Sequence, residues 1–351
     1  MAQLKGAALR MENKKQNPIK KLLSARGVGQ VVTVFCGLIV LCFVFNRINP
    51  NFWGDRNRAN LLRQIAPYII IGIGQGYVLI TANIDLSIGS VVGMSCMMSA
   101  TLMCNGMHPL LALLITMAAC ITTGALNGVL VAECKLPPFV ATLGTQTICR
   151  GIAQMVNGNM NTDSIVGAGY QYREFAEGLR NFFYYNKTLG IYNTFWIAIV
   201  IWLIFNFILA YTRTGRHLYA IGSNSEASKL SGVSVSKTIL KAYLVSSFCA
   251  GITGFIVCAQ SGTGTMNAGM SYETFAVAAS VIGGISTMGG TGILSGVLAG
   301  ASVWAVMDNG LQMVGTSVGL KNVVVGLIVI CSVLIDVVRR TGKLSFKHKK
   351  A

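Results

Sequence analysis

Long apolar segments alternate with shorter polar ones along almost the whole chain. Between residues 30 and 338 there are about ten apolar segments, and several reach the roughly 20 residues that a helix needs to cross a bilayer. The segments are continuous, whereas the strands of a membrane β-barrel alternate apolar and polar positions. The pattern therefore predicts an all-α, polytopic membrane protein of about ten transmembrane helices.

The predicted helices form a single membrane domain, residues 30–338. A basic N-terminal region, residues 1–29, precedes it, and a basic C-terminal region, residues 339–351, follows it. The helices cover residues 30–46, 64–81, 86–104, 109–132, 138–156, 192–211, 238–260, 273–286, 292–312 and 322–338. The segment 273–286 is short for a full span, so we expect it to be tilted or broken. The even number of helices predicts that both termini lie on the same side of the membrane.

Composition and charge support this topology. Hydrophobic residues make up 53% of the chain and charged residues 11%, against about 25% charged residues in a soluble domain. Most of the 28 Lys and Arg lie in the two terminal regions and in the polar stretch 211–241. The positive-inside rule then places both termini in the cytoplasm. The net charge of +17 follows from topology, and because the basic residues form no single face, nucleic-acid binding is not expected.

Glycine is abundant, with 40 residues, and much of it lies inside the predicted helices. Five pairs have the GxxxG spacing: Gly72–Gly76, Gly89–Gly93, Gly124–Gly128, Gly292–Gly296 and Gly296–Gly300. In lipid this spacing lets helix backbones approach closely. The pairs together predict a compact bundle.

Polar residues at membrane depth are the first candidates for a translocation path or a gate, because they are costly there and usually functional. Asp85 breaks the apolar pattern just before the segment 86–104, where it either caps that helix or takes part directly in the path. Arg150 is the one cation well within a span, and a pairing with Asp85 stays open. The other candidates are Gln75, Asn127, Gln146, Asp308 and Asn309, which equally suit hydrogen bonds between helices.

Several chemistries are missing from the sequence. It contains no GxxxxGK[ST] loop for nucleotide phosphates, no HExxH, no GxSxG and only three scattered histidines. Nor does it carry the dense intramembrane charge of a proton-coupled carrier. We expect no catalytic residue and no bound metal, and if the protein pumps, the energy enters from another polypeptide.

Four stretches resemble the ribose/galactose-type ABC importer permeases. Residues 83–90 read NIDLSIGS, similar to a GxDLSVGS motif with Asn83 in place of the usual Gly. Residues 136–144 read LPPFVATLG and lead to Arg150–Gly151, and residues 272–279 and 281–290 read YETFAVAA and VIGGISTMGG. Within the polar stretch, residues 214–233 read TGRHLYAIGSNSEASKLSGV, similar to the cytoplasmic loop of these permeases. The resemblance covers most of the chain, in order.

The resemblance implies a type II-like ABC importer permease bundle that pairs with a second copy of itself. A cytoplasmic ABC ATPase, often two fused nucleotide-binding domains, would carry ATP and Mg, and an extracytoplasmic binding protein would deliver the sugar. The coupling loop 212–237 would dock on the ATPase through a short helix, and a bland solvated loop is the alternative. Its candidate residues are Gly215, Arg216, Ala220, Gly222, Asn224, Glu226, Ala227, Leu230, Ser231 and Gly232. Ser223 or Asn224 is predicted to cap that helix, with Glu226 in its first turn.

The implied function is import of a monosaccharide such as ribose or galactose across the bacterial cytoplasmic membrane. The external loop 157–191 is rich in aromatic residues, so it either contributes to a platform for the binding protein or anchors at the membrane interface. A self-sufficient facilitator or secondary carrier for a small polar solute is the alternative function, in which Asp85 and Arg150 would couple or gate. The sequence does not identify the sugar.

Overall fold

The computed structural model describes residues 28–341, so the basic regions predicted at 1–29 and 339–351 lie almost entirely outside the described residues. Each of the ten predicted segments falls on a helix. These helices are α3 (Val28–Ile48), α4 (Asp55–Ile80), α5 (Ile88–Cys104), α6 (Pro109–Ala132), α7 (Pro138–Met155), α9 (Asn193–Tyr211), α12 (Val235–Ser261), α13 (Tyr272–Ile282), α14 (Leu294–Met313) and α15 (Val318–Thr341). Within the described residues, four helices are long and apolar enough to cross a membrane, namely α3, α6, α9 and α12.

Two helices differ from the apolar pattern at their ends. Helix α4 begins at Asp55 rather than at residue 64, because its first turns are polar and the apolar pattern could not include them. Asp55 lies in the first turn, where a negative charge stabilises the positive end of the helix dipole. Helix α13 has only 11 residues and stops at Ile282, which confirms that this segment is short. An irregular glycine-rich loop, residues 283–293, follows it.

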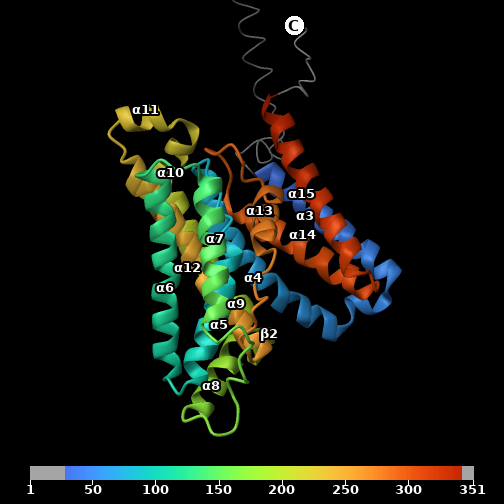
Figure 1. Cartoon of the computed structure of the whole chain (residues 1–351). Coiled ribbons are helices and arrows are strands. Elements are labelled where there is room, and N and C mark those ends of the chain that lie inside the picture. Colours follow the sequence, from blue (N-terminus) through green and yellow to red (C-terminus); the bar gives the residue numbers. More distant parts are fainter. Residues whose placement is uncertain (1–27, 342–351) are drawn as a thin grey trace, which may run out of the picture.

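Helix α4 is the central element of the bundle (Figure 1). It packs against α9, α12, α13 and α14, and α12 in turn packs against α5 and α6. On one side of α4 lie α5, α6, α7 and α12, and on the other lie α3, α13, α14 and α15. Every residue of α4 from Ile65 to Ile80 is buried, which is the pattern of a helix enclosed on all sides.

The short elements gather at the two ends of the bundle (Figure 1). Helices α10 (Arg213–Ser223) and α11 (Ser225–Leu230) lie at one end, where the coupling loop 212–237 was predicted. The opposite end carries α8 (Arg173–Arg180), the π-helical turn η2 (Asn181–Tyr185) and the antiparallel pair β1 (Lys187–Thr188) and β2 (Ile191–Tyr192). They lie within the predicted external loop 157–191, except that β2 extends one residue beyond it. A 3-10 turn, η1 (Pro50–Trp53), joins α3 to α4.

Close helix packing occurs at the predicted glycine pairs. A Cβ on Gly124 would lie 2.7 Å from the Tyr243 carbonyl oxygen, and one on Gly128 would lie 2.8 Å from Leu240 Cα. No larger residue fits at either position while α6 stays this close to α12. One pair was assigned wrongly to a helix: Gly292 precedes α14 and takes a φ of +132°, which an L-residue rarely adopts.

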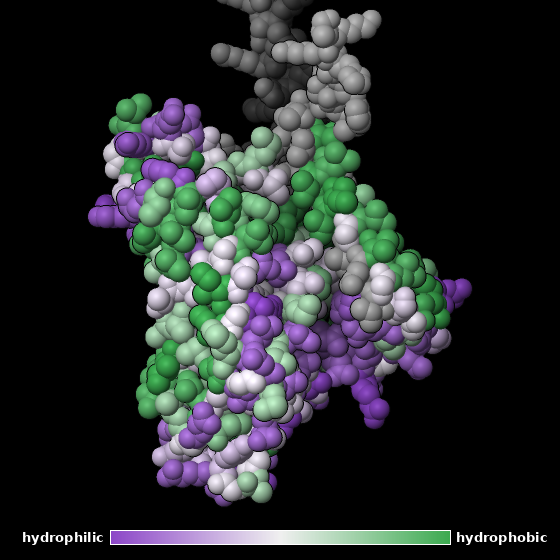
Figure 2. All heavy atoms as spheres, viewed as in Figure 1, coloured by the Kyte–Doolittle hydropathy of each residue, from purple (hydrophilic) through white to green (hydrophobic). Residues whose placement is uncertain are grey.

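The surface separates into polar ends and apolar flanks (Figure 2). Hydrophilic residues gather at the end that carries α10 and α11, at the end that carries α8 and along the middle of this face, while hydrophobic residues cover much of the flanks. Large apolar side chains on the outer helices are exposed, for example Ile39 of α3 at 67% and Phe207 of α9 at 59%. Such exposure suits contact with lipid, as expected for a multi-pass integral membrane protein.

Candidate functional site

Asp85 lies in the loop between α4 and α5 and is 1% exposed. Its Oδ1 accepts hydrogen bonds from the Ser87 amide at 2.9 Å and from the Ser87 hydroxyl at 2.6 Å. Its Oδ2 accepts from the Ser246 hydroxyl of α12 at 2.6 Å. Asp85 thus accepts from the amide of Ser87, which is the N-cap residue of α5, and not from an amide within the helix, and it ties that helix start to α12. Its capping role stays a prediction.

The hydrogen bonds of Asp85 continue into two further helices. The Asn127 side chain of α6 donates to Ser87 Oγ at 2.9 Å, and the Thr145 hydroxyl of α7 donates to Asn127 Oδ1 at 2.7 Å. We call Asp85, Ser87, Asn127, Thr145 and Ser246 the buried polar network, since each is at most 2% exposed. It links the start of α5 to α6, α7 and α12. The side chains of Asp85 and Asn127 are therefore occupied by hydrogen bonds within the network.

Arg150 does not pair with Asp85. Its Nη1 instead donates to the backbone carbonyls of Met266 at 3.1 Å and Ala268 at 2.8 Å, in the loop between α12 and α13. The same nitrogen lies close to α5, since a Cβ on Gly93 would be 2.7 Å from it. The glycine thus leaves the room that the guanidinium occupies, and Arg150 anchors the 262–271 loop to α7.

Glu273 is a polar group that the candidate residues did not include. It lies in the first turn of α13, and its Oε2 is buried without a hydrogen-bond partner. A Cβ on Gly89 would lie 2.1 Å from that oxygen. Glu273 and Arg150 therefore meet the same face of α5 one turn apart, at Gly89 and Gly93. Two separate signals in the sequence point to this site. One is an acidic residue at the start of an apolar segment, and the other is the Gly89–Gly93 spacing on the helix that Glu273 contacts.

The remaining path candidates lie in different surroundings. Gln75 is fully buried in α4, and neither of its side-chain polar atoms has a hydrogen-bond partner. Asn309 donates to Asn57 and Gln64 of α4, and its neighbour Asp308 forms an ion pair with Lys321. Gln146 is half-buried on α7. The seven candidates are thus not gathered into one site, and a path role for each stays a prediction.

The coupling loop 212–237 is folded into two short helices at the end of the bundle. The Thr212 hydroxyl accepts from the Gly215 amide at the start of α10, and Asn224 Oδ1 accepts from the Ala227 amide at 2.9 Å to cap α11. This confirms the predicted Asn224 cap. Glu226 lies in the first turn of α11 and Lys229 in its last, both in the orientation that the helix dipole favours.

One side of α10 packs against the body of the protein. A Cβ on Gly222 would lie 1.8 Å from the Ile80 carbonyl oxygen at the end of α4, and one on Gly215 would lie 1.9 Å from the Leu209 carbonyl oxygen. The Tyr219 hydroxyl donates to the Gly292 carbonyl at 2.7 Å, and burial raises the pKa of Tyr219 to about 12. Gly215 and Gly222, both candidates for docking, therefore face this chain, and a bulky residue at Gly222 would disturb the packing of α10 against α4.

The contacts of α10 converge on the 283–293 loop. The Gly290 amide of that loop donates to the same Ile80 carbonyl that lies against Gly222. Arg216 and Ala220 line a groove between α10 and this loop. A displacement of α10 would thus be passed directly to the end of α4 and to the loop that joins α13 to α14.

Helices α10 and α11 form a helical hairpin, and the side of this α10–α11 hairpin that lies away from α4 faces solvent. Glu226, Ala227, Ser231 and Gly232 are exposed, and Leu230 is 90% exposed. Leu230 is therefore accessible to a docking partner at this end of the bundle. The ten candidate residues of the loop divide between these two sides.

Comparison with known proteins identifies the family. The model of the branched-chain amino acid transport system/permease component family matches residues 57–333. A ribose import permease protein of Bacillus subtilis (strain 168) is 32% identical over 317 residues, which are 90% of this chain and 96% of that protein. In Escherichia coli (strain K12), a D-allose transport system permease protein is 31% identical over 301 residues (85% of this chain, 89% of that protein).

A galactose/methyl galactoside import permease protein of the same E. coli strain is 31% identical over 325 residues, which are 88% of this chain and 95% of that protein. No solved structure shows significant similarity to the chain. The chain therefore belongs to this family of transport permeases, and the resemblance to sugar import permeases is confirmed.

Proposed function

We propose that this chain, as a member of that permease family, is the membrane-spanning subunit of an ABC importer that moves a monosaccharide into the cytoplasm. The support is that the relatives are import permeases for ribose, allose and galactose and that each aligns over most of its length. In this proposal the protein crosses the bacterial cytoplasmic membrane about ten times, with both termini in the cytoplasm, and it catalyses no bond change.

The energy comes from a separate ABC ATPase that carries ATP and Mg and docks on α11. The observation that carries this part is the two-sided hairpin: Leu230 is 90% exposed while Gly222 lies against the end of α4. ATP shifts the balance between inward-open and outward-open states only through its differential affinity for them. Docking on α11 links the ATPase to these two states of the permease, because α10 connects the hairpin to α4 and to the 283–293 loop.

On the external side, the 157–191 segment is the proposed platform for a sugar-binding protein. Support comes from its polar exposed surface at the end of the bundle opposite α11 (Figures 1 and 2). A second copy of the chain completes the transporter, with the path between the two. Selectivity for the sugar then resides largely in the binding protein.

The experiment is a pull-down of tagged protein from mild detergent, coupled to uptake of radiolabelled ribose and galactose. The variant is Leu230→Glu, and the control is Leu189→Glu at the tip of the opposite end, where the side chain is 86% exposed. Because both side chains are exposed, neither change is expected to alter folding. We expect Leu230→Glu to lose both the ATPase and the uptake and Leu189→Glu to keep the ATPase. Leu189→Glu controls the pull-down alone, because Leu189 lies in the segment proposed to receive the sugar-binding protein.

Two results would contradict the proposal. If both variants retained an ATPase equally well, α11 would not be the docking element. A purified protein without any partner that still moved sugar into liposomes would instead be a self-sufficient carrier.

A further inference from the structure

An apolar groove lies on the outside of the bundle, and import as proposed above does not use it. Phe248 and Ile252 of α12 form its floor, Leu114 of α6 one wall and Val200 of α9 the other. Its volume is about 540 Å³. The three helices that form it are among those that are long and apolar enough to cross a membrane. In the membrane the groove is therefore surrounded by lipid hydrocarbon.

The walls of the groove are open to that surrounding. Leu114 is 63% exposed and Val200 is 52% exposed. Since water is absent at this depth, only an apolar chain fills the space without cost. The groove thus selects hydrocarbon, either from lipid or from another transmembrane segment.

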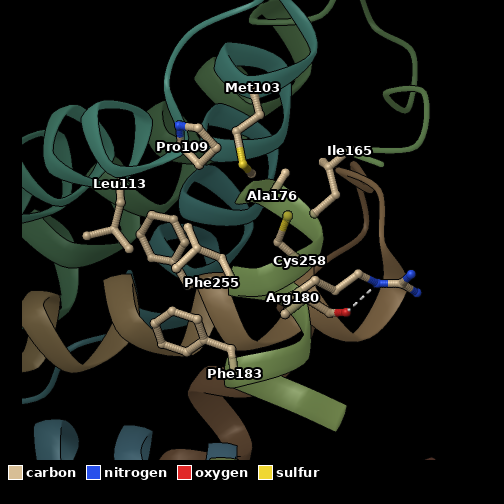
Figure 3. Close-up of a pocket in the computed structure, with 11 residues that line it drawn as sticks. Met103, Pro109, Leu113, Ile165, Ala176, Arg180, Phe183, Phe255 and Cys258 are labelled. Atoms are coloured by element: carbon tan, nitrogen blue, oxygen red, sulfur yellow. Dashed lines mark hydrogen bonds between the residues drawn. The ribbon is translucent and has the colours of Figure 1, made fainter. Parts of the chain in front are cut away.

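The apolar space continues toward the end that carries α8 (Figure 3). A smaller cavity shares Leu113, Phe183 and Phe255 with the groove. Figure 3 shows the two phenylalanine rings and Leu113 on one side of this cavity, while the guanidinium of Arg180 points away from them and donates to the Ala259 carbonyl at 3.1 Å. A cation thus lies at the margin of the apolar space.

One end of the groove is polar and is built like a membrane interface. Thr188 and Asn193 line it, and the Trp196 indole donates to the Thr188 carbonyl at 3.0 Å. Lys187, next to Thr188, is exposed and lies 4.7 Å from the ring centroid of Tyr192. Tryptophan, tyrosine and lysine are the residues that anchor proteins at lipid head groups.

Lys187, at this end, has no carboxylate of the described residues within ion-pair distance. Among residues 28–341 the ion pairs are Arg58 with Asp55 and Lys321 with Asp308, so Lys187 and Arg180 are in neither. The ammonium group of Lys187, next to Thr188 at the rim of the groove, is complementary to the phosphate of a lipid head group. Together with the tryptophan and tyrosine at this rim, that charge favours a phospholipid as the occupant.

We propose that this groove binds one glycerophospholipid with an anionic head group. An acyl chain lies between Leu114 and Val200 on the floor of α12, and the phosphate lies beside Lys187. Bound there, the lipid fills the gap between α6 and α9 and holds both helices against α12.

The test is native mass spectrometry of the purified full-length protein in mild detergent with equal amounts of phosphatidylglycerol and phosphatidylethanolamine. Wild type is expected to retain phosphatidylglycerol in preference. Val200→Trp fills the groove and should lose the bound lipid. Ile204→Trp is the matched control, because Ile204 lies one turn further along α9, is 51% exposed and does not line the groove.

Two further variants separate the parts of the proposal. Lys187→Ala should keep a phospholipid but lose the preference for phosphatidylglycerol. Leu114→Trp fills the groove from the opposite wall and should also lose the lipid, and it replaces Val200→Trp in the test if that variant does not elute as a folded protein. Equal lipid retention by the two α9 variants would overturn the proposal, as would an unchanged preference in Lys187→Ala. A disulfide between two copies through Val200→Cys in native membranes would assign the groove to a protein interface instead.

Discussion

Asp85 is the residue at which the capping role and a path role can be separated by experiment. The buried polar network gives its two carboxyl oxygens three donors: the amide and hydroxyl of Ser87 and the hydroxyl of Ser246. Two substitutions are compared, Asp85→Ala and Asp85→Asn. The first removes both oxygens, and the second keeps one oxygen toward Ser87 and presents an amide group to Ser246.

The magnitudes follow from the donors that lose their acceptor. In Asp85→Ala the Ser246 hydroxyl can turn to a carbonyl of its own helix, but the two donors of Ser87 remain buried and unsatisfied. Each such donor costs about 1–3 kcal/mol, so the loss of stability is about 2–6 kcal/mol. In Asp85→Asn the hydrogen bonds lose charge assistance, but the neutral amide also costs less to bury. The net change should stay within about 1 kcal/mol.

The assay is the unfolding temperature of the purified protein in detergent, measured together with sugar uptake in cells at matched expression. We expect Asp85→Ala to lower the midpoint by an amount on the order of 10 °C and Asp85→Asn by far less. Ser95→Ala is the control, because it removes a buried hydroxyl that donates to the Gly251 carbonyl on α12, outside the network, and should cost about 1 kcal/mol.

Two outcomes would refute this reasoning. If Asp85→Ala unfolded at the wild-type temperature, the network would not hold α5 in place. If Asp85→Asn kept its stability but abolished uptake, the carboxylate charge itself would be required, and Asp85 would act in the path or its gate.

Three further predictions concern other parts of the chain. Tyr219→Phe loses the hydrogen bond to the Gly292 carbonyl, which is worth about 0.5–1.5 kcal/mol. Because Tyr219 lies on the side of α10 that faces this chain, the ATPase should still co-purify, while uptake per ATP hydrolysed falls. An unchanged ratio of uptake to ATP hydrolysis would argue against transmission through α10. Gly222→Val should reduce the yield of folded protein in size-exclusion chromatography, unlike Ala227→Val, whose side chain is exposed. Glu273→Gln should leave the unfolding temperature unchanged or raise it, since Glu273 Oε2 has no partner to lose, and a clear fall would indicate a missed interaction.

Much of the architecture was predictable because it depends on local composition. Ten apolar segments were expected and ten helices were found at those places, since each helix satisfies its own backbone hydrogen bonds wherever the chain is apolar. The Asn224 cap was also predictable, because capping involves residues three positions apart. The polar first turns of α4 were missed because apolar periodicity alone does not detect a polar helix.

The contacts between distant segments were decided by tertiary structure. The sequence left open whether Asp85 and Arg150 form a pair. The fold answers that they do not, because Asp85 accepts from Ser246 and Arg150 donates to the Met266 carbonyl. Likewise, glycine at position 222 was read as part of a docking surface until the end of α4 was found against it.

The sequence by itself determined the class of protein, the positions of its helices and, through its motifs, the permease family. Apolar composition and short-range spacing are properties of neighbouring residues, and they survive in any arrangement of the helices. Which side of the α10–α11 hairpin faces inward, and which polar groups share hydrogen bonds, depends on residues of different helices, such as Asp85 and Ser246, which are 161 positions apart. Only close packing of the helices brings such residues together, so only the tertiary structure could decide their roles.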